Sequence, residues 1–108
     1  MGLESKYVKE DKLLVLKITE ELDHHTVEKI RRKADYEIER YIPRKVVLDF
    51  NQVSFMDSAG IGLILGRYKN VSILGGKLEV TNVSNQVIKI LNMSGVSKLI
   101  DINKEECA

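Results

Sequence analysis

The segment from Val53 to Gly62 holds the residues of this chain that are best suited to chemistry. It reads VSFMDSAGIG, with a carboxylate and a hydroxyl adjacent at Asp57 and Ser58 and two glycines shortly after them. An apolar, strand-like run ends at Phe50 before it, and a helical pattern follows. In open parallel sheets, ligand sites gather at the carboxyl ends of strands, where such connections lie. This segment is therefore the first candidate for a functional site.

Serine hydrolysis is one chemistry that the segment could suggest. The nucleophile elbow of hydrolases needs G-x-S-x-G, but residue 56 is Met, so the first glycine is missing. The two histidines, His24 and His25, precede Ser58, which is opposite to the chain order of that fold. The sequence therefore argues against a hydrolase.

Phosphate-binding chemistry fits the segment only in part. A dinucleotide-binding loop needs G-x-G-x-x-G, but Leu65 stands where the third glycine should be. A receiver-type phosphoacceptor at Asp49 needs a lysine after the last strand, where the chain reads Asp101-Ile102-Asn103. We expect Gly62 and Gly66 instead to let a helix approach the sheet closely.

A further interpretation makes Ser58 a substrate. At a helix N-terminus, unsatisfied backbone N–H groups and the helix dipole favour a negative charge. A phosphate on Ser58 would add about −1.5 to −2 charge, and Asp57 would add repulsion. The simpler alternative is that Ser58 is a plain N-cap, and the residue types alone favour that alternative.

Two other clusters are predicted to be ordinary surface. His24 and His25 follow Asp23 before a helix, and adjacent side chains on a helix diverge by about 100°, so they are poor ligands for one metal ion. The run Arg31-Arg32-Lys33 could bind an anion, but its acidic neighbours favour a solvated helix face.

The remaining pattern predicts an α/β fold with a small, mostly parallel sheet and helices packed against it. Strand-like runs alternate with helical periods, which implies right-handed βαβ crossovers. The expected strands are Leu3–Val8, Leu13–Ile18, Val46–Phe50, Lys77–Val83 and Leu99–Ile102. The expected helices run from Val27 to before Pro43, from Gly60 to Tyr68, and from Asn85 to before Gly95. Residues 104–108 are expected to form a frayed turn.

Helical spacing also predicts which side chains are buried. Asp23 or Thr26 is expected to cap the first helix and Ser84 the last. The predicted inward positions are Val27, Ile30, Ala34, Ile38 and Tyr41 in the first helix, Ile61, Ile64, Leu65, Tyr68 and Val71 in the second, and Val87, Ile90 and Leu91 in the third.

Composition limits the classes of protein that remain. The 108 residues predict a single domain over 1–108, and 17 Lys and Arg against 16 Asp and Glu give no excess of positive charge for nucleic acid. The longest uncharged apolar stretch, Ala59–Gly66, is far shorter than the roughly 20 residues of a membrane span. One cysteine, Cys107, cannot form an internal disulfide or a zinc site. No signal peptide is found at the N-terminus, so the chain is expected to be cytoplasmic. No cofactor is expected.

Four blocks of the sequence resemble those of the anti-sigma factor antagonists, small bacterial proteins with the STAS fold. The blocks are Glu21-Leu22-Asp23-His24-His25-Thr26, Ser54-Phe55-Met56-Asp57-Ser58 followed by Gly60, Leu65-Gly66-Arg67-Tyr68-Lys69, and Met93-Ser94-Gly95. The resemblance covers roughly Val8 to Ile102 and is closest to the sporulation branch, the anti-sigma F factor antagonists.

This resemblance implies a binding module that is controlled by phosphorylation and is not an enzyme. Such a protein binds an anti-sigma factor that is also a serine kinase carrying ADP or ATP, and binding releases the sigma factor. The kinase phosphorylates the D-S serine, here Ser58, which ends binding, and a PP2C-type phosphatase reverses the modification. The implied partner surface comprises Asp23, His24, Asp57, Ser58, Gly60 and Gly62, and the free protein is expected to be a monomer.

The chain departs from the family pattern at three points. Glu20 replaces a usual Gly before E-L-D, Ala59 replaces a second serine of close relatives, and the chain ends at Ala108, before the longer C-terminal helix of some relatives. With Ala59 in place, Ser58 is the one hydroxyl next to Asp57. The alternatives left open are a stress-response antagonist of the same family and, in another class, a small nucleotide-binding or hydrolytic domain that uses residues Asp57–Gly62.

Overall fold

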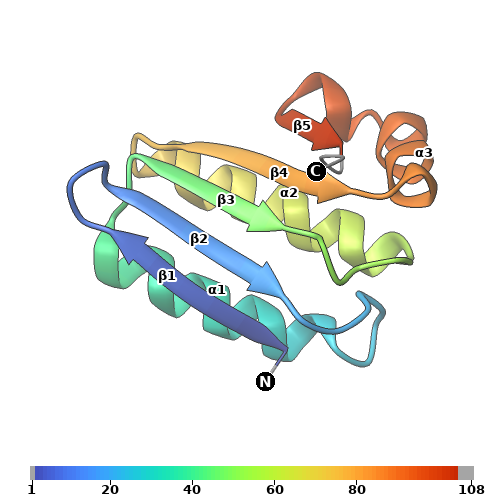
Figure 1. Cartoon of the computed structure of the whole chain (residues 1–108), viewed down its shortest axis with the longest axis horizontal. Helices are drawn as coiled ribbons and strands as arrows, with labels where there is room; N and C mark the ends of the chain where they lie inside the picture. The colour runs from blue at the N-terminus through green and yellow to red at the C-terminus, as the bar shows by residue number, and fades with distance from the viewer. Residues whose placement is uncertain (1, 105–108) are drawn as a thin grey trace.

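Five strands lie side by side in sequence order and form one sheet (Figure 1). The structure is a computed structural model that describes residues 2–104. Strands β1 and β2 pair antiparallel, and every later pair is parallel. This confirms the mostly parallel α/β sheet. The bounds are β1 Leu3–Val8, β2 Leu13–Ile18, β3 Lys45–Asp49, β4 Lys77–Val83 and β5 Asp101–Lys104.

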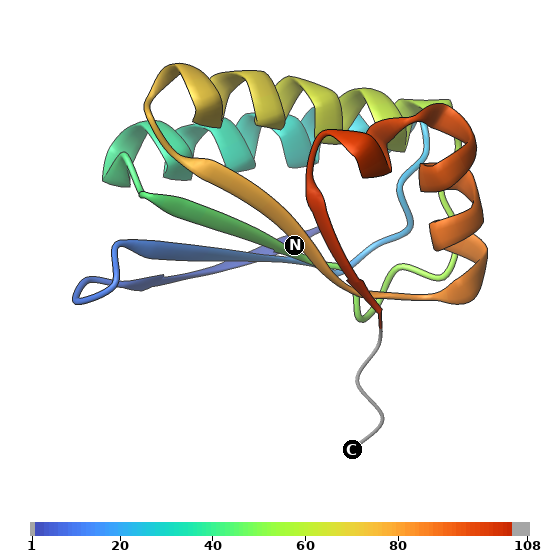
Figure 2. The same ribbon diagram turned by 90° about the horizontal axis from the view of Figure 1, so that it is seen from above.

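The helices connect the parallel strands. Seen from above, α1 and α2 cover one face of the sheet, while α3 lies beyond the end of β4 (Figure 2). The carboxyl ends of β2 and β3 lead into the connections before α1 and α2, so these connections lie at one edge of the sheet. The bounds are α1 Val27–Tyr41, α2 Ser58–Ile73, α3 Asn85–Ser94 and a 3-10 helix, η1, Val96–Lys98.

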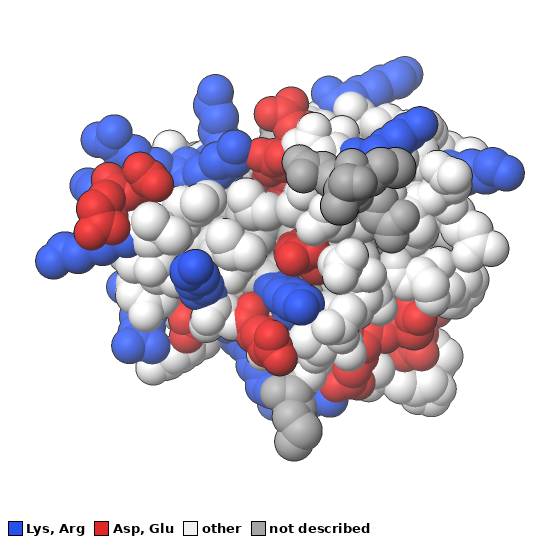
Figure 3. Space-filling model, viewed as in Figure 1, with Lys and Arg blue, Asp and Glu red and all other residues white. Residues whose placement is uncertain are grey.

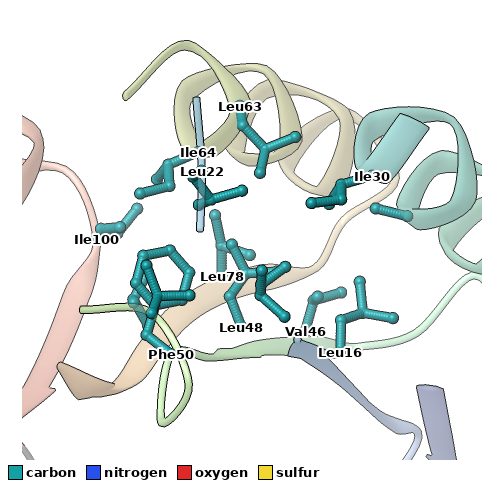
Figure 4. Packing of buried hydrophobic residues seen from close by; sticks show 14 of the residues in the cluster. Leu16, Leu22, Ile30, Val46, Leu48, Phe50, Leu63, Ile64, Leu78 and Ile100 are labelled. Atoms are coloured by element: carbon teal, nitrogen blue, oxygen red, sulfur yellow. The ribbon is translucent and has the colours of Figure 1, made fainter. Parts of the chain in front are cut away.

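The core lies between the sheet and the two covering helices (Figure 4). Alternate residues of β2 and β3 point inward and are fully buried, because successive side chains of a strand face opposite sides. Helices α1 and α2 add apolar side chains from above. The labelled core residues of the strands and these helices include Leu16, Val46, Leu48, Ile30, Leu63 and Ile64.

Several predicted element boundaries need correction. Strand β3 begins and ends one residue earlier than expected, so the buried Phe50 follows it, although the Phe50 N–H still donates to the Thr81 carbonyl. The last strand begins at Asp101 and not at Leu99, because the chain first makes the η1 turn after Gly95. Lys104 ends β5 and is not part of a frayed turn. Residues 105–108, including Cys107, lie outside the described residues.

The inward face of α2 differs from the prediction. Ile64 and Val71 are buried as expected, but Ile61, Leu65 and Tyr68 are only half-buried. Leu63 and Arg67 are buried in their place. The buried stripe turns toward α1, where Arg67 meets Asp35, so sheet packing alone does not set it. Smaller differences occur at Val27, Tyr41 and Ile90, which are also half-buried.

The glycine that allows a close contact of α2 is Gly60, and not Gly62 or Gly66 as predicted. A Cβ at Gly62 or Gly66 would meet no atom within 4 Å, so neither glycine is required for packing. A Cβ at Gly60 would lie 2.8 Å from the Met56 sulfur and 2.9 Å from the Met56 Cβ. Gly60 therefore lets the first turn of α2 pack against the connection that precedes it.

Candidate functional site

Two connections, which we call the site loops, run side by side at the carboxyl edge of the sheet. They are residues 19–26 after β2 and residues 50–57 after β3. Leu22 and Met56, both fully buried, form an isolated parallel bridge between them, and the Asp57 N–H donates to the Leu22 carbonyl at 3.1 Å. The loops thus pair with each other beyond the ends of β2 and β3, which places Asp57 beside the residues that follow Leu22.

Glu21 binds the other site loop through both carboxylate oxygens. Its Oε1 accepts the Ser54 and Phe55 N–H groups, each at 2.9 Å, and its Oε2 accepts the Ser54 hydroxyl. Burial raises the pKa of Glu21, but the hydrogen bonds from the Ser54 hydroxyl and the two backbone N–H groups together outweigh it, so its pKa is lowered. A carboxylate with these donors is held in its ionised form.

Asp57, and not Ser58, is the N-cap of α2. The Asp57 backbone is extended, and its Oδ1 accepts the Ala59 N–H at 2.8 Å. Ser58 is the first residue of the helix and is exposed, so the plain N-cap interpretation of Ser58 was wrong. The difference arises because the aspartate one residue earlier already supplies the acceptor that an N-cap provides.

Asp23 shapes the turn that leads into α1. Its Oδ1 accepts the His25 N–H at 2.8 Å and the Thr26 N–H at 3.1 Å. The hydrogen bond from the His25 N–H is the largest cause of the lowered pKa of Asp23; burial opposes it, and the Thr26 N–H adds to it. Thr26 is in the N-cap position but makes no side-chain cap hydrogen bond, and the N–H groups that Asp23 Oδ1 accepts belong to residues before the helix. The prediction that one of these two side chains caps the first helix was therefore wrong.

The predicted partner surface is only partly assembled around Ser58. His24 Nδ1 lies 3.9 Å from Asp57 Oδ2, so these two predicted residues, one from each site loop, lie close together beside Ser58. Gly62 is exposed on α2, whereas Gly60 is buried against Met56.

The histidine pair and the basic run lie where ordinary surface was expected. His24 and His25 are exposed, but they lie in a turn before α1 and their ring centroids are 4.1 Å apart, so the expected divergence was wrong. The basic run is a solvated helix face, with Arg31 paired to Glu28 and Asp35.

The sequence did not predict an apolar groove next to Ser58. Met93 is a large apolar residue that is 88% exposed. A shallow groove between α2 and α3 starts at Ser58 and continues over Ile61, Ile90 and Met93. Met93 was quoted in one of the resembling blocks, but a block match does not show which side of a helix is exposed.

Charge and metal-binding groups give no sign of another kind of site in the described part of the chain. Positive and negative side chains are interspersed on the face seen in Figure 3. Within residues 2–104 no group of three or more His, Cys, Asp or Glu could hold a metal ion. No helix in that range combines the length and apolar character needed to cross a membrane.

The comparison with known families agrees with this geometry. A family model described as STAS domain matches residues 5–106. The chain belongs to the STAS domain family. This STAS domain is 39% identical over 94 residues to the anti-sigma F factor antagonist of Paenibacillus polymyxa, covering 87% of this chain and 80% of that protein. It is 31% identical over 86 residues to the anti-sigma-B factor antagonist of Bacillus subtilis strain 168, covering 80% and 77%.

Solved structures place the STAS domain beside the Bacillus protein SpoIIAA. The unphosphorylated form of SpoIIAA, described as an anti-sigma factor antagonist, matches with a TM-score of 0.79 and 32% identity, covering 95% of this chain and 89% of that one. The phosphorylated form matches with a TM-score of 0.71 and 31% identity, covering 95% and 92%. The shared fold confirms the STAS-type architecture that the sequence predicted.

Proposed function

We propose that this STAS domain is an anti-sigma factor antagonist that is switched by phosphorylation of Ser58. The relatives named above are anti-sigma factor antagonists by name, and the Bacillus protein SpoIIAA is known in a phosphorylated form. The observation that supports Ser58 most directly is its exposure at the first turn of α2, where its hydroxyl makes no hydrogen bond to any described residue. An accessible serine without a base is a suitable substrate for a kinase and a poor nucleophile.

The partner in this proposal is an anti-sigma factor that is also a serine kinase with bound ADP or ATP. The unphosphorylated chain binds it through Asp23, His24, Asp57, Ser58 and Gly62, and the sigma factor is released. Gly60, predicted as part of this surface, is buried against Met56 and supports the surface from below. A PP2C-type phosphatase restores the unmodified chain. The chain itself acts as a monomer and has no catalytic role, and a sigma-factor pathway places it in the cytoplasm.

Phosphorylation acts on the interface and leaves the fold in place. The open N–H groups at the start of α2 favour an added dianion on Ser58. The anti-sigma factor, however, would have to desolvate about two negative charges close to the Asp57 carboxylate. Uncompensated burial of such charge costs several kcal/mol, so we expect affinity to fall about a hundredfold or more.

The greater similarity to the anti-sigma F factor antagonist favours a role in sporulation over a stress response. The same-family alternative, antagonism of the anti-sigma-B factor, uses the same site with another kinase and sigma factor. The alternative of a nucleotide-binding loop over Asp57–Gly62 has little support, because residues 58–62 are helical.

Incubation with the cognate anti-sigma factor kinase and ATP, followed by intact mass measurement, tests the proposal. We expect one phosphate on the unmodified chain, none on Ser58→Ala, and one on the control variant Ser94→Ala. Ser58→Ala should still bind the kinase and persist in the complex. A phosphate on Ser54 or Ser94, or a modified Ser58→Ala chain, would contradict the assignment.

A further inference from the structure

We propose that Glu21 is a positioning residue for the Ser58 site: it fixes the backbone at Ser54 and Phe55 so that Asp57 and Ser58 are presented correctly at the start of α2. This inference rests on the proposed function for its effect on the partner. Its structural part, the fixing of the loop, concerns the free chain and can be tested without any partner.

The contacts of Glu21 are concentrated on two consecutive residues of the other site loop. One carboxylate oxygen accepts both backbone N–H groups, at 2.9 Å each, and the other oxygen accepts the Ser54 hydroxyl. Asp57 follows Phe55 by two residues. Glu21 therefore holds the loop two residues before the cap of α2.

The rest of this loop is anchored on both sides of the Glu21 contact, but not within it. Val53 is buried on one side, and Met56 is buried and bridged to Leu22 on the other. Ser54 and Phe55 between them are exposed, and the only acceptor that their backbone N–H groups find among the described residues is the Glu21 carboxylate. Without Glu21, water can replace it at these exposed groups. We therefore expect loss of local order with little loss of overall stability.

A different role for Glu21 would be direct contact with the partner through its charge. The two roles separate in Glu21→Gln, because a glutamine side-chain oxygen can still accept both backbone N–H groups while the charge is gone. Glu21→Ala removes both the acceptor and the charge. Glu10→Ala is a matched control, since Glu10 is an exposed glutamate in the β1–β2 turn with no contact to either site loop.

The experiment combines amide hydrogen exchange on the free chain with the affinity for the anti-sigma factor. In Glu21→Ala we expect faster exchange at Ser54 and Phe55, an unfolding midpoint close to that of the parent, and about tenfold weaker binding. Glu21→Gln should stay within about threefold of the parent affinity, and Glu10→Ala should match the parent. Ser54→Ala, which removes one of the three contacts, should fall between the parent and Glu21→Ala.

Two results would overturn the proposal. Unchanged exchange at Ser54 and Phe55 in Glu21→Ala would show that Glu21 does not fix the loop. Equal losses of affinity in Glu21→Gln and Glu21→Ala would show that its charge contacts the partner instead. If the parent chain itself fails to bind any anti-sigma factor, the proposed function fails, and the exchange measurement still decides whether Glu21 holds the loop.

Discussion

Arg67 of α2 and Asp35 of α1 form an ion pair, with 2.8 Å between Arg67 Nε and Asp35 Oδ1. The Arg67 side chain is only 6% exposed. Burial lowers the pKa of Arg67, and the Asp35 carboxylate opposes that shift. Neither Arg67 Nε nor Nη1 makes an aligned hydrogen bond within the described residues, so Asp35 compensates the buried charge mainly through attraction. Asn70 also donates to Asp35 Oδ1, at 3.1 Å.

Replacing Asp35 should therefore destabilise the fold strongly. Asp35→Ala leaves the Arg67 charge buried without its partner, and we expect the free energy of unfolding to fall by about 3 kcal/mol. Adding Arg67→Met should recover much of this loss, because an apolar pair needs no compensation. Urea unfolding measures both variants. Glu39→Ala, on the exposed side of the same helix, is the control and should change stability by less than about 0.5 kcal/mol. A double variant no more stable than Asp35→Ala would contradict this account.

The glycines at the start of α2 should respond in opposite ways to alanine. Gly60→Ala forces a Cβ against buried Met56 and should cost about 1–3 kcal/mol. Gly62→Ala meets open space in a helix interior and should gain about 0.5–1 kcal/mol. Thermal unfolding gives both values. If Gly62 also lies in the partner surface, Gly62→Ala should weaken binding to the anti-sigma factor while it stabilises the free chain. Equal destabilisation by the two changes would refute the placement of α2.

Side-chain truncation tests the corrected inward face of α2. Ile64 is fully buried, so Ile64→Ala should cost about 2–5 kcal/mol. Leu65 is only half-buried, and Leu65→Ala should cost about 1 kcal/mol, because part of its surface already faces water. Chemical denaturation gives the free energy of unfolding of both variants, provided that it depends on denaturant concentration with the same slope in each. A larger loss for Leu65→Ala would restore the face that the sequence predicted.

A permanent charge at Ser58 should weaken the partner complex without changing the fold. Ser58→Asp adds less charge than a phosphate, so we expect affinity for the anti-sigma factor to fall about tenfold or more, less than the phosphorylated chain. Isothermal calorimetry gives the affinity, and backbone chemical shifts report the fold. Ser72→Asp makes the same charge change near the other end of α2 and should bind like the parent. Shifts spread through the sheet in Ser58→Asp would argue for refolding instead.

The titration of Glu21 should depend on Ser54. Because the pKa of Glu21 is lowered in the folded chain, the ionised form contributes stability at neutral pH, and this contribution is lost as the pH falls through the lowered pKa. Ser54→Ala removes the hydroxyl contact, so the pKa of Glu21 should rise toward its ordinary value. Carbon-detected NMR of the carboxyl group measures it. In Ser94→Ala, the Glu21 titration should match the parent, and an equal shift there would contradict the assigned cause.

Local sequence patterns predicted most of the fold because each depends on neighbours along the chain. The period of two in β2 and the period near 3.6 in α1 come from local backbone geometry. Asp57 and Ser58 were identified as candidates because they are adjacent, and the short connection after β3 places them at the sheet edge. The resemblance to a known family, and not the spacing, linked Asp23 and His24 to them.

Features that join distant segments were not predictable in this way. Glu21 and Ser54 are 33 residues apart, and they meet only because the site loops pair again at the Leu22–Met56 bridge, two residues out of the register of β2 and β3. The buried face of α2 depends on where α1 lies, and the spacing of apolar residues within α2 does not show the position of α1. The N-cap of α2 could have been either Asp57 or Ser58, because both side chains can accept a hydrogen bond. Only the backbone conformation shows that it is Asp57.

The capping of α2 by Asp57 has a consequence for how long a phosphorylated state would last. Since Ser58 takes no part in the cap, a phosphate there breaks no hydrogen bond of the folded chain and stands beside backbone N–H groups that favour it. The modified chain would keep the hydrogen bonds of the unmodified one, and repulsion from the Asp57 carboxylate would not by itself break the phosphate ester. The lifetime of the signal would then be set entirely by how fast another protein removes the phosphate.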